Sequence, residues 1–188
     1  MLVCHFAIVV YIQKVSRMTL VQCRCMETII ILTAVLQGLA ISLGVGSSTL
    51  AIVNFFVAIA DGKIDEIERK MMGVVYVVLR IAMVAILATT LLLVAMSHQA
   101  GISVSQGAQL TILAVLFINA VLMTKHLMPS KYGPSIQAGS WYALSIVSSL
   151  AAMEVNGYTY TLFAIVYVIW LVLVTIIVNG VMAWLKPK

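Results

Sequence analysis

Long apolar runs alternate with short polar segments along this chain. The runs are continuous, without the strict alternation of apolar and polar residues that is typical of membrane β-strands. Most reach the roughly 20 residues that a helix needs to cross a hydrocarbon core of about 30 Å, and helices satisfy their own backbone hydrogen bonds there. The pattern predicts an all-α, polytopic membrane helical bundle with five transmembrane helices, over residues 28–60, 71–97, 110–128, 137–155 and 161–185.

The first of these segments is longer than one bilayer requires. A straight helix over residues 28–60 would measure about 50 Å, so it either tilts and projects or breaks. A break is possible at Gly44–Ser48, where glycine and serine weaken helix continuity. Discontinuous helices form solute sites in transporters, which is one interpretation of this segment.

The other interpretation is close helix packing, which requires an intact helix and is the one we favour. Small residues recur every fourth position in this segment and form a ridge suited to contact with a helix or with a second copy of the chain. The candidate packing residues are Ala34, Gly38, Ser42 and Gly46.

Composition supports a membrane protein. Hydrophobic residues make up 63% of the 188 positions and charged residues only 9%, too few polar groups to cover the surface of a water-soluble domain. The net charge of +5 comes from residues scattered over loops and ends, so we expect the lipid bilayer as partner and no nucleic acid.

The distribution of lysine and arginine predicts the orientation. Basic residues occur in segments 61–70 and 125–136 and in the C-terminal tail, whereas segments 98–109 and 154–160 contain no lysine or arginine. Basic loops face the cytoplasm. We therefore expect a multi-pass protein of the cell membrane, with a cytoplasmic C-terminus and the N-terminus of the first span outside.

Residues 1–25 do not fit this pattern. They carry Lys14, Arg17 and Arg24 on the side predicted to be outside, together with all three cysteines, and their apolar run is too short to span. We expect them to be an upstream extension from a misassigned start, with Met26 as the true start, or a loosely attached appendage. Residues 26–188 then form a single domain.

Arg80 is the first candidate for function, because a fixed charge within an apolar run is costly and should face the bundle interior. Helical rise places Arg80 and three asparagines about 9–15 Å from the cytoplasmic ends of their helices, with a serine at a comparable depth. One interpretation is a solute site with Arg80 as counter-charge; the other, somewhat favoured, is an arginine that reaches the interface while asparagines bridge helices. The candidate solute-binding residues are Arg80, Asn54, Asn119, Asn179 and Ser145.

We find no pattern that indicates catalysis or a cofactor. His98 and His126 end different spans on opposite sides of the bilayer and cannot share one metal. No histidine lies within a span to activate a serine, and Cys23 and Cys25 lack the spacing of a dithiol motif. We expect no catalytic residues, no cofactor, no metal site and no enzyme activity.

These observations favour a small-solute or anion transporter or channel, with a polar cavity open to the cytoplasm. The substrate or ion is not specified, and a homo-oligomer is compatible with the small-residue ridge. The alternative is a non-catalytic interaction or assembly module that packs through small-residue helix faces, one on the first span and one at Ser145, Ser148, Ser149 and Ala152.

Overall fold

A computed structural model describes the backbone of residues 2–61, 66–96, 101–125, 127–129, 132–153, 155 and 157–185. Side chains are described for these residues from Met26 onward, except at positions 61 and 68. The described chain is all helical, as the apolar runs predict. Its five helices are α1 (Leu2–Asp61), α2 (Glu66–Met96), α3 (Val104–Thr124), α4 (Gly133–Ala152) and α5 (Tyr160–Leu185).

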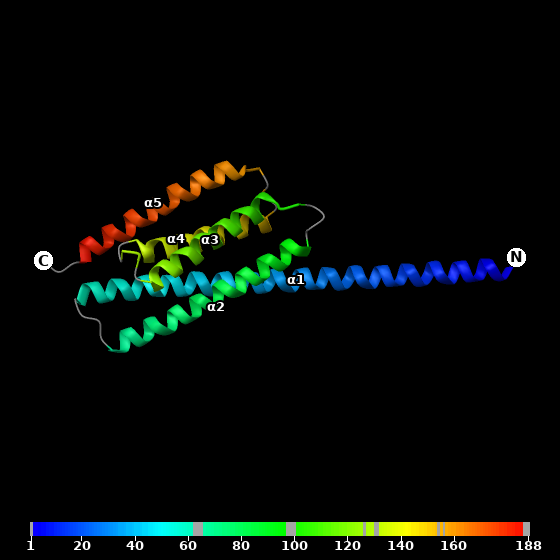
Figure 1. Cartoon of the computed structure of the whole chain (residues 1–188), viewed down its shortest axis with the longest axis horizontal. Coiled ribbons are helices and arrows are strands. Elements are labelled where there is room, and N and C mark those ends of the chain that lie inside the picture. Colours follow the sequence, from blue (N-terminus) through cyan, green and yellow to red (C-terminus); the bar gives the residue numbers. More distant parts are fainter. Residues whose placement is uncertain are drawn as a thin grey trace.

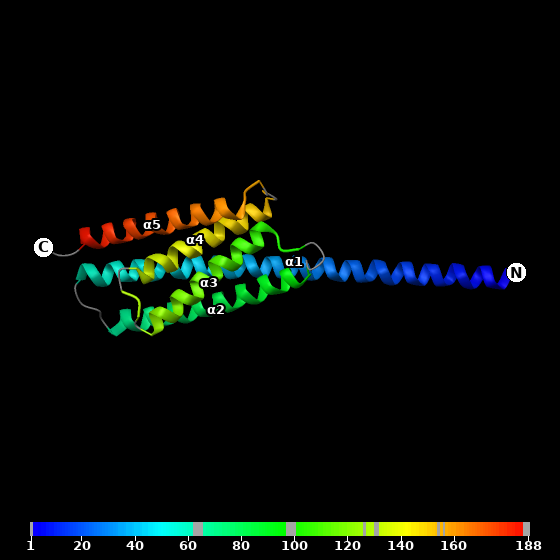
Figure 2. The same cartoon turned by 45° about the horizontal axis from the view of Figure 1, so that its top comes forward.

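The helices form an antiparallel bundle in which each runs opposite to the one before it (Figure 1). The ends of α1, α3 and α5 and the starts of α2 and α4 lie together (Figures 1 and 2). We call this the basic end, after Arg69 and Lys70 on α2 and Lys125 after α3. The opposite end is the distal end, beyond which the N-terminal part of α1 projects (Figure 1).

Four helical segments among the described residues are long and apolar enough to cross a membrane: Met26–Ala60, Arg69–Met96, Val104–Thr124 and Tyr160–Leu185. Their outward faces carry exposed isoleucine, leucine and valine side chains, such as Leu39, Ile81 and Ile169. Exposed apolar faces of this extent indicate contact with lipid. The chain is therefore an integral membrane protein with a helical-bundle fold.

The fifth helix, α4, is less apolar but lies deepest in the bundle. It packs against α1, α3 and α5, and its buried residues include Ser135, Ser140, Trp141 and Leu144. Because neighbouring helices cover α4, its side chains need not match lipid. Burial thus explains why serine and glycine make up a larger share of this helix than of the other four.

The helix α1 has no break at Gly44–Ser48, so the possible interruption there is wrong. A Cβ atom at Gly44 would overlap the ring of Trp141, which is fully buried. Gly44 therefore serves close packing between α1 and α4. Ser48 and Thr49 return hydrogen bonds to the Val45 carbonyl (2.9 and 2.7 Å), which satisfies their hydroxyls within the helix.

The packing face of α1 differs from the predicted ridge. Its described buried positions are Thr33, Ala40, Ile41, Gly44, Ser47, Ser48 and Ala58. By contrast, Ala34, Gly38, Ser42 and Gly46 are all exposed, and a Cβ at Gly38 or Gly46 would meet nothing within 4 Å. The ridge packs on no described helix of its own chain, and its contact with a second chain stays a prediction.

Local signals in the sequence explain why α3 and α4 begin earlier than the apolar pattern predicts. Ser103 and Gln106 form a capping box that starts α3 at Val104 instead of residue 110. Pro134 occupies the first turn of α4, where backbone N–H groups have no acceptor within the helix. The N–H group that proline lacks therefore costs the helix no hydrogen bond. As a result, Gln137 lies inside α4 and not at its edge.

Candidate functional site

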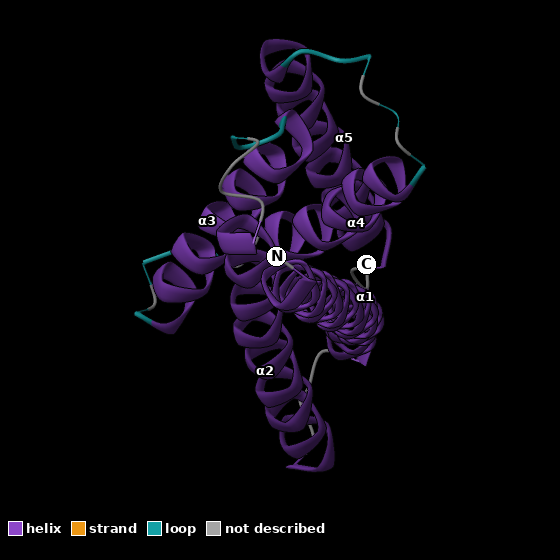
Figure 3. Cartoon of the chain, turned by 90° about the vertical axis from the view of Figure 1, so that its right-hand side faces the viewer, coloured by secondary structure: helices purple, strands orange, loops and turns teal. Residues whose placement is uncertain are grey.

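A cleft of about 290 Å³ lies at the basic end between α2, α3 and α4. It lies where α2 packs against α1 and α3 while, over the described residues, its Cα atoms stay more than 8 Å from those of α4. Figure 3 shows α2 and α3 diverging from each other on one side of the bundle. The lining residues are Tyr76, Leu79, Arg80, Met83, Ala120, Met123, Thr124 and Gln137.

A second, smaller cavity of about 20 Å³ adjoins the cleft and extends it toward α1. The two share Tyr76, Leu79, Met123 and Gln137 in their walls. On the α1 side the wall is formed by Ser48, Ala51, Ile52 and Phe55. Gln137 thus lies where four helices meet around the cleft.

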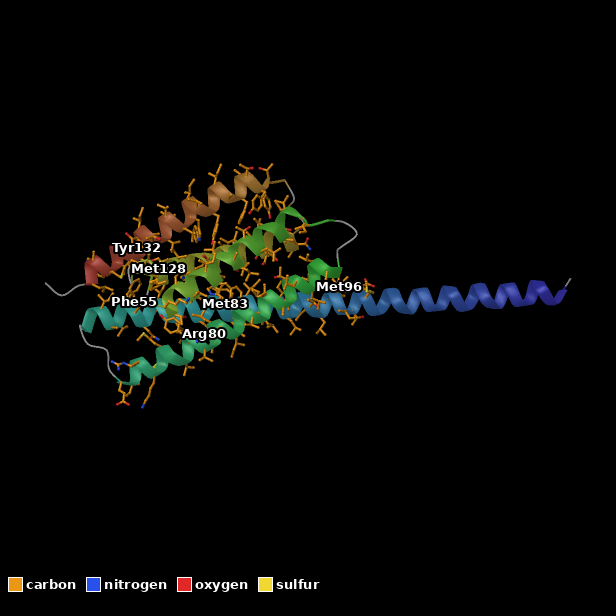
Figure 4. All side chains as sticks on the ribbon, viewed as in Figure 1. Phe55, Arg80, Met83, Met96, Met128 and Tyr132 are labelled. Atoms are coloured by element: carbon orange, nitrogen blue, oxygen red, sulfur yellow. The ribbon has the colours of Figure 1, made fainter. Side chains whose placement is uncertain are left out.

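Arg80 supplies the positive charge of the cleft. Its Nη2 atom donates a long hydrogen bond, 3.5 Å, to the hydroxyl of Thr124 at the end of α3. The structure describes no carboxylate bound to this guanidinium; the ion pair it describes, Lys70 with Glu66, is elsewhere on α2. Figure 4 shows Arg80 and Met83 on α2, between the basic end and Met96.

The guanidinium of Arg80, ten residues after Lys70 on α2, reaches the C-terminal end of α3. Since Arg80 reaches Thr124, the last residue of α3, it lies level with the end of that helix. The carbonyl groups at a helix C-terminus carry partial negative charge, which favours a nearby cation. Arg80 is exposed and not enclosed in the bundle core.

Asn119 lies behind the cleft and is 2% exposed. Its Nδ2 donates to the Gly133 carbonyl and to Oε1 of Gln137, each at 3.0 Å, so it joins α3 to the start of α4. Its Oδ1 is buried without a hydrogen-bond partner. Asn119 therefore bridges helices directly and touches the cleft through Gln137 and through the sulfur of Met123, 3.7 Å from its Nδ2.

Gln137 is the site residue that the sequence pattern missed. It is 8% exposed, and among the described residues its Nε2 meets only the sulfur of Met83, at 3.8 Å. A sulfur atom is a weak acceptor, so this donor group is poorly satisfied. The signal in the sequence is a glutamine within one turn of a proline that starts a helix.

The remaining candidates are not brought to Arg80. Asn179 donates to the Thr175 carbonyl of its own helix at 2.9 Å. Asn54 on α1 and Ser145 on α4 are half-buried and line neither cavity at the basic end. Arg80 thus lines the same cleft as Gln137, to which Asn119 is bonded, and the other three candidates lie apart. Solute binding by any of the five stays a prediction.

A separate polar cluster lies toward the distal end and joins four helices. Gln37 Nε2 donates to Thr90 Oγ1 at 2.9 Å and to Gln109 Oε1 at 3.3 Å. Gln109 Nε2 in turn donates to Ser148 Oγ at 3.3 Å. Along α2, α3 and α4 this cluster is separated from the cleft by fully buried apolar residues: Ile86, Ile112, Leu113, Leu116, Trp141 and Leu144.

No group of three or more histidine, cysteine, aspartate or glutamate side chains that could hold a metal is found among the residues described. Comparison of the chain with protein-family models, with curated proteins and with solved structures gives no match. The identification therefore rests on the helices themselves, and it is that of an integral membrane protein built as a helical bundle.

Proposed function

We propose that this protein is a transporter for a small anionic or polar solute, which enters the cleft at the basic end from the cytoplasm. The observation that carries the proposal is Arg80, an arginine in a cleft whose described hydrogen-bond partner is one hydroxyl at 3.5 Å. An arginine in the apolar part of a membrane helix is costly unless it is solvated or paired. An anion in the cleft would offset part of that cost.

The layering of the bundle supports a transporter with its site open on one side. The cleft at the basic end is followed by an apolar layer and then by the hydrogen-bonded cluster at Gln37, Thr90 and Gln109. Passage of a solute would require the helices around that layer to separate. We therefore propose an alternating mechanism in preference to a continuously open pore.

The orientation follows from the charges. Arg69, Lys70 and Lys125 lie at the basic end, and basic segments remain on the cytoplasmic side of membranes. We propose that the basic end is cytoplasmic and that α4, shielded by its neighbours, is a fifth crossing. The membrane is then the cell membrane, with the distal end outside.

Flux through proteoliposomes tests the transport proposal. Purified protein would be assayed for uptake of radiolabelled phosphate, lactate and benzoate. Arg80→Gln should abolish uptake of any anion that the unchanged protein carries, because the counter-charge is removed. Lys125→Gln removes the same charge at the nearby end of α3 without lining the cleft, so it should keep uptake.

Uptake that is unaffected by Arg80→Gln would contradict the proposal. Arg80 would then be an interfacial arginine that reaches toward the headgroups, as its position beside the end of α3 also allows.

The exposed ridge on α1 favours a second candidate, a membrane module that assembles with another copy of itself. Small residues allow two helix backbones to approach closely, and Ala34, Gly38, Ser42 and Gly46 have no such partner within the described chain. Gly38→Leu should then shift the protein from dimer to monomer in detergent. Leu39→Ala, on an adjacent exposed position, serves as control; a mass that is the same for all three forms would contradict the candidate.

A further inference from the structure

We infer that the cleft recognises an oxyanion, a carboxylate or phosphate, that is joined to an apolar body. This inference rests on the proposed function and names its substrate class. Two donor groups from different helices, the Arg80 guanidinium and the Gln137 amide, line one cleft whose other walls are largely apolar.

The hydrogen bonds of Asn119 fix which way the Gln137 amide points. The group of Asn119 near the Gly133 carbonyl must be its NH2, because two oxygens cannot form a hydrogen bond with each other. The same NH2 lies 3.0 Å from the Gln137 amide, which must therefore present its oxygen to Asn119. This leaves the NH2 of Gln137 directed toward Met83, a residue of the cleft wall. Asn119 thus positions Gln137 as a donor.

The contact with Thr124 leaves most of the Arg80 guanidinium available. The Thr124 hydroxyl donates its proton to the Ala120 carbonyl at 2.7 Å, so it acts only as an acceptor toward Arg80. A guanidinium has five N–H groups, arranged to bind carboxylate or phosphate oxygens in pairs. Arg80 and Gln137 together therefore offer donors, and no described acid, to a bound group.

The walls of the cleft indicate what is attached to the oxyanion. Leu79, Met83, Ala120 and Met123 provide apolar surface, and a volume of about 290 Å³ is at the small end of ligand sites. Val77, Ile81 and Val121, each next in sequence to a lining residue, are apolar and exposed on the same helices. Both features favour a small amphipathic anion over a fully hydrated ion.

Such a group has two sources: a soluble organic anion, or the phosphate of an anionic phospholipid that enters between α2 and α3. A binding experiment with one defined compound first tests whether the cleft binds an oxyanion on an apolar body, whichever of these two ligands is the natural one. We would use hexyl phosphate, with inorganic phosphate lacking the apolar body and hexanol lacking the charge.

The full chain in phosphatidylcholine nanodiscs would be titrated with each compound by calorimetry. Hexyl phosphate should bind, whereas inorganic phosphate and hexanol should bind at least about tenfold more weakly, since each lacks one of the two contacts. Arg80→Gln and Gln137→Glu should each weaken hexyl phosphate binding about tenfold or more, the loss expected for a charge-assisted hydrogen bond. Gln137→Glu retains an oxygen that accepts from Asn119, replaces the donor by a second acceptor and adds a negative charge that opposes a bound anion. Lys125→Gln should bind like the unchanged protein.

Nanodiscs that also contain phosphatidylglycerol identify the source. If phosphatidylglycerol weakens the binding of hexyl phosphate, the inference is supported and the natural ligand is a lipid. Binding that is independent of phosphatidylglycerol would support it with a soluble anion.

The inference is overturned if inorganic phosphate binds as well as hexyl phosphate, or if Gln137→Glu binds hexyl phosphate normally. In either case a continued loss with Arg80→Gln would leave the proposed anion transporter in place. If Arg80→Gln binds every tested anion as well as the unchanged protein does, the proposed anion transporter is contradicted as well.

Discussion

Asn119 illustrates how one buried side chain joins two helices in this protein. Its single NH2 group serves both the Gly133 carbonyl and the Gln137 oxygen. Both acceptors belong to buried residues. Without it the Gln137 oxygen would lose its described partner, and the Gly133 carbonyl would keep only its helical hydrogen bond. A buried polar group without a partner costs about 1–3 kcal/mol.

We therefore expect Asn119→Ala to lower the free energy of unfolding by about 1–3 kcal/mol. Asn179→Ala is the matched control, because Asn179 is half-buried and bonds only to its own helix, and it should change stability by less than about 0.5 kcal/mol. Unfolding in detergent, followed by circular dichroism, measures both. Equal stability of the two variants would contradict the bridging role.

The sequence identifies Arg80 because a charge in an apolar run needs no further context. It does not identify Gln137, because the significance of this residue depends on a bond from another helix and on a helix start at Gly133. Trp141 shows the same limit: tryptophan near a span end predicts an interfacial position, yet its ring is fully buried against Gly44. Contacts between helices are not encoded in local hydropathy.

At the scale of the helices, the contact of α1 with α4 depends on Gly44. A methyl group at this position would overlap the Trp141 ring, whereas the same group at Gly38 or Gly46 would meet no atom within 4 Å. The three glycines occupy one helix and differ only in the face on which they lie. They therefore provide an internal comparison.

We expect Gly44→Ala to destabilise the protein by about 1–3 kcal/mol through overpacking. Gly38→Ala should be neutral or stabilising by up to about 1 kcal/mol, because alanine favours helix. Thermal unfolding in detergent distinguishes them. Destabilisation by Gly38→Ala that matches Gly44→Ala would show that α1 packs through the other face.

The number and type of helices follow from the apolar runs because lipid requires both length and apolarity. The starts of α3 and α4 do not follow from the apolar runs. The start of α3 depends on the capping box at Ser103, and the start of α4 depends on Pro134. The continuity of α1 is likewise a consequence of packing. Gly44 lies against α4, and no water competes for backbone groups in that interior.

For the molecule as a whole, the proposed transport depends on the two ends of the bundle facing opposite compartments. Thr124 and Arg80 mark the basic end, and Ile102 precedes α3 at the distal end. The cysteines of the chain all lie within residues 1–25, so their replacement by serine gives a background for single-cysteine variants.

Labelling of Thr124→Cys and Ile102→Cys by a membrane-impermeant maleimide is the most direct test. In intact cells Ile102→Cys should react and Thr124→Cys should not, whereas in inverted vesicles the pattern should reverse. Reaction of both positions from the same face would contradict a membrane-spanning bundle with a cytoplasmic cleft at Arg80.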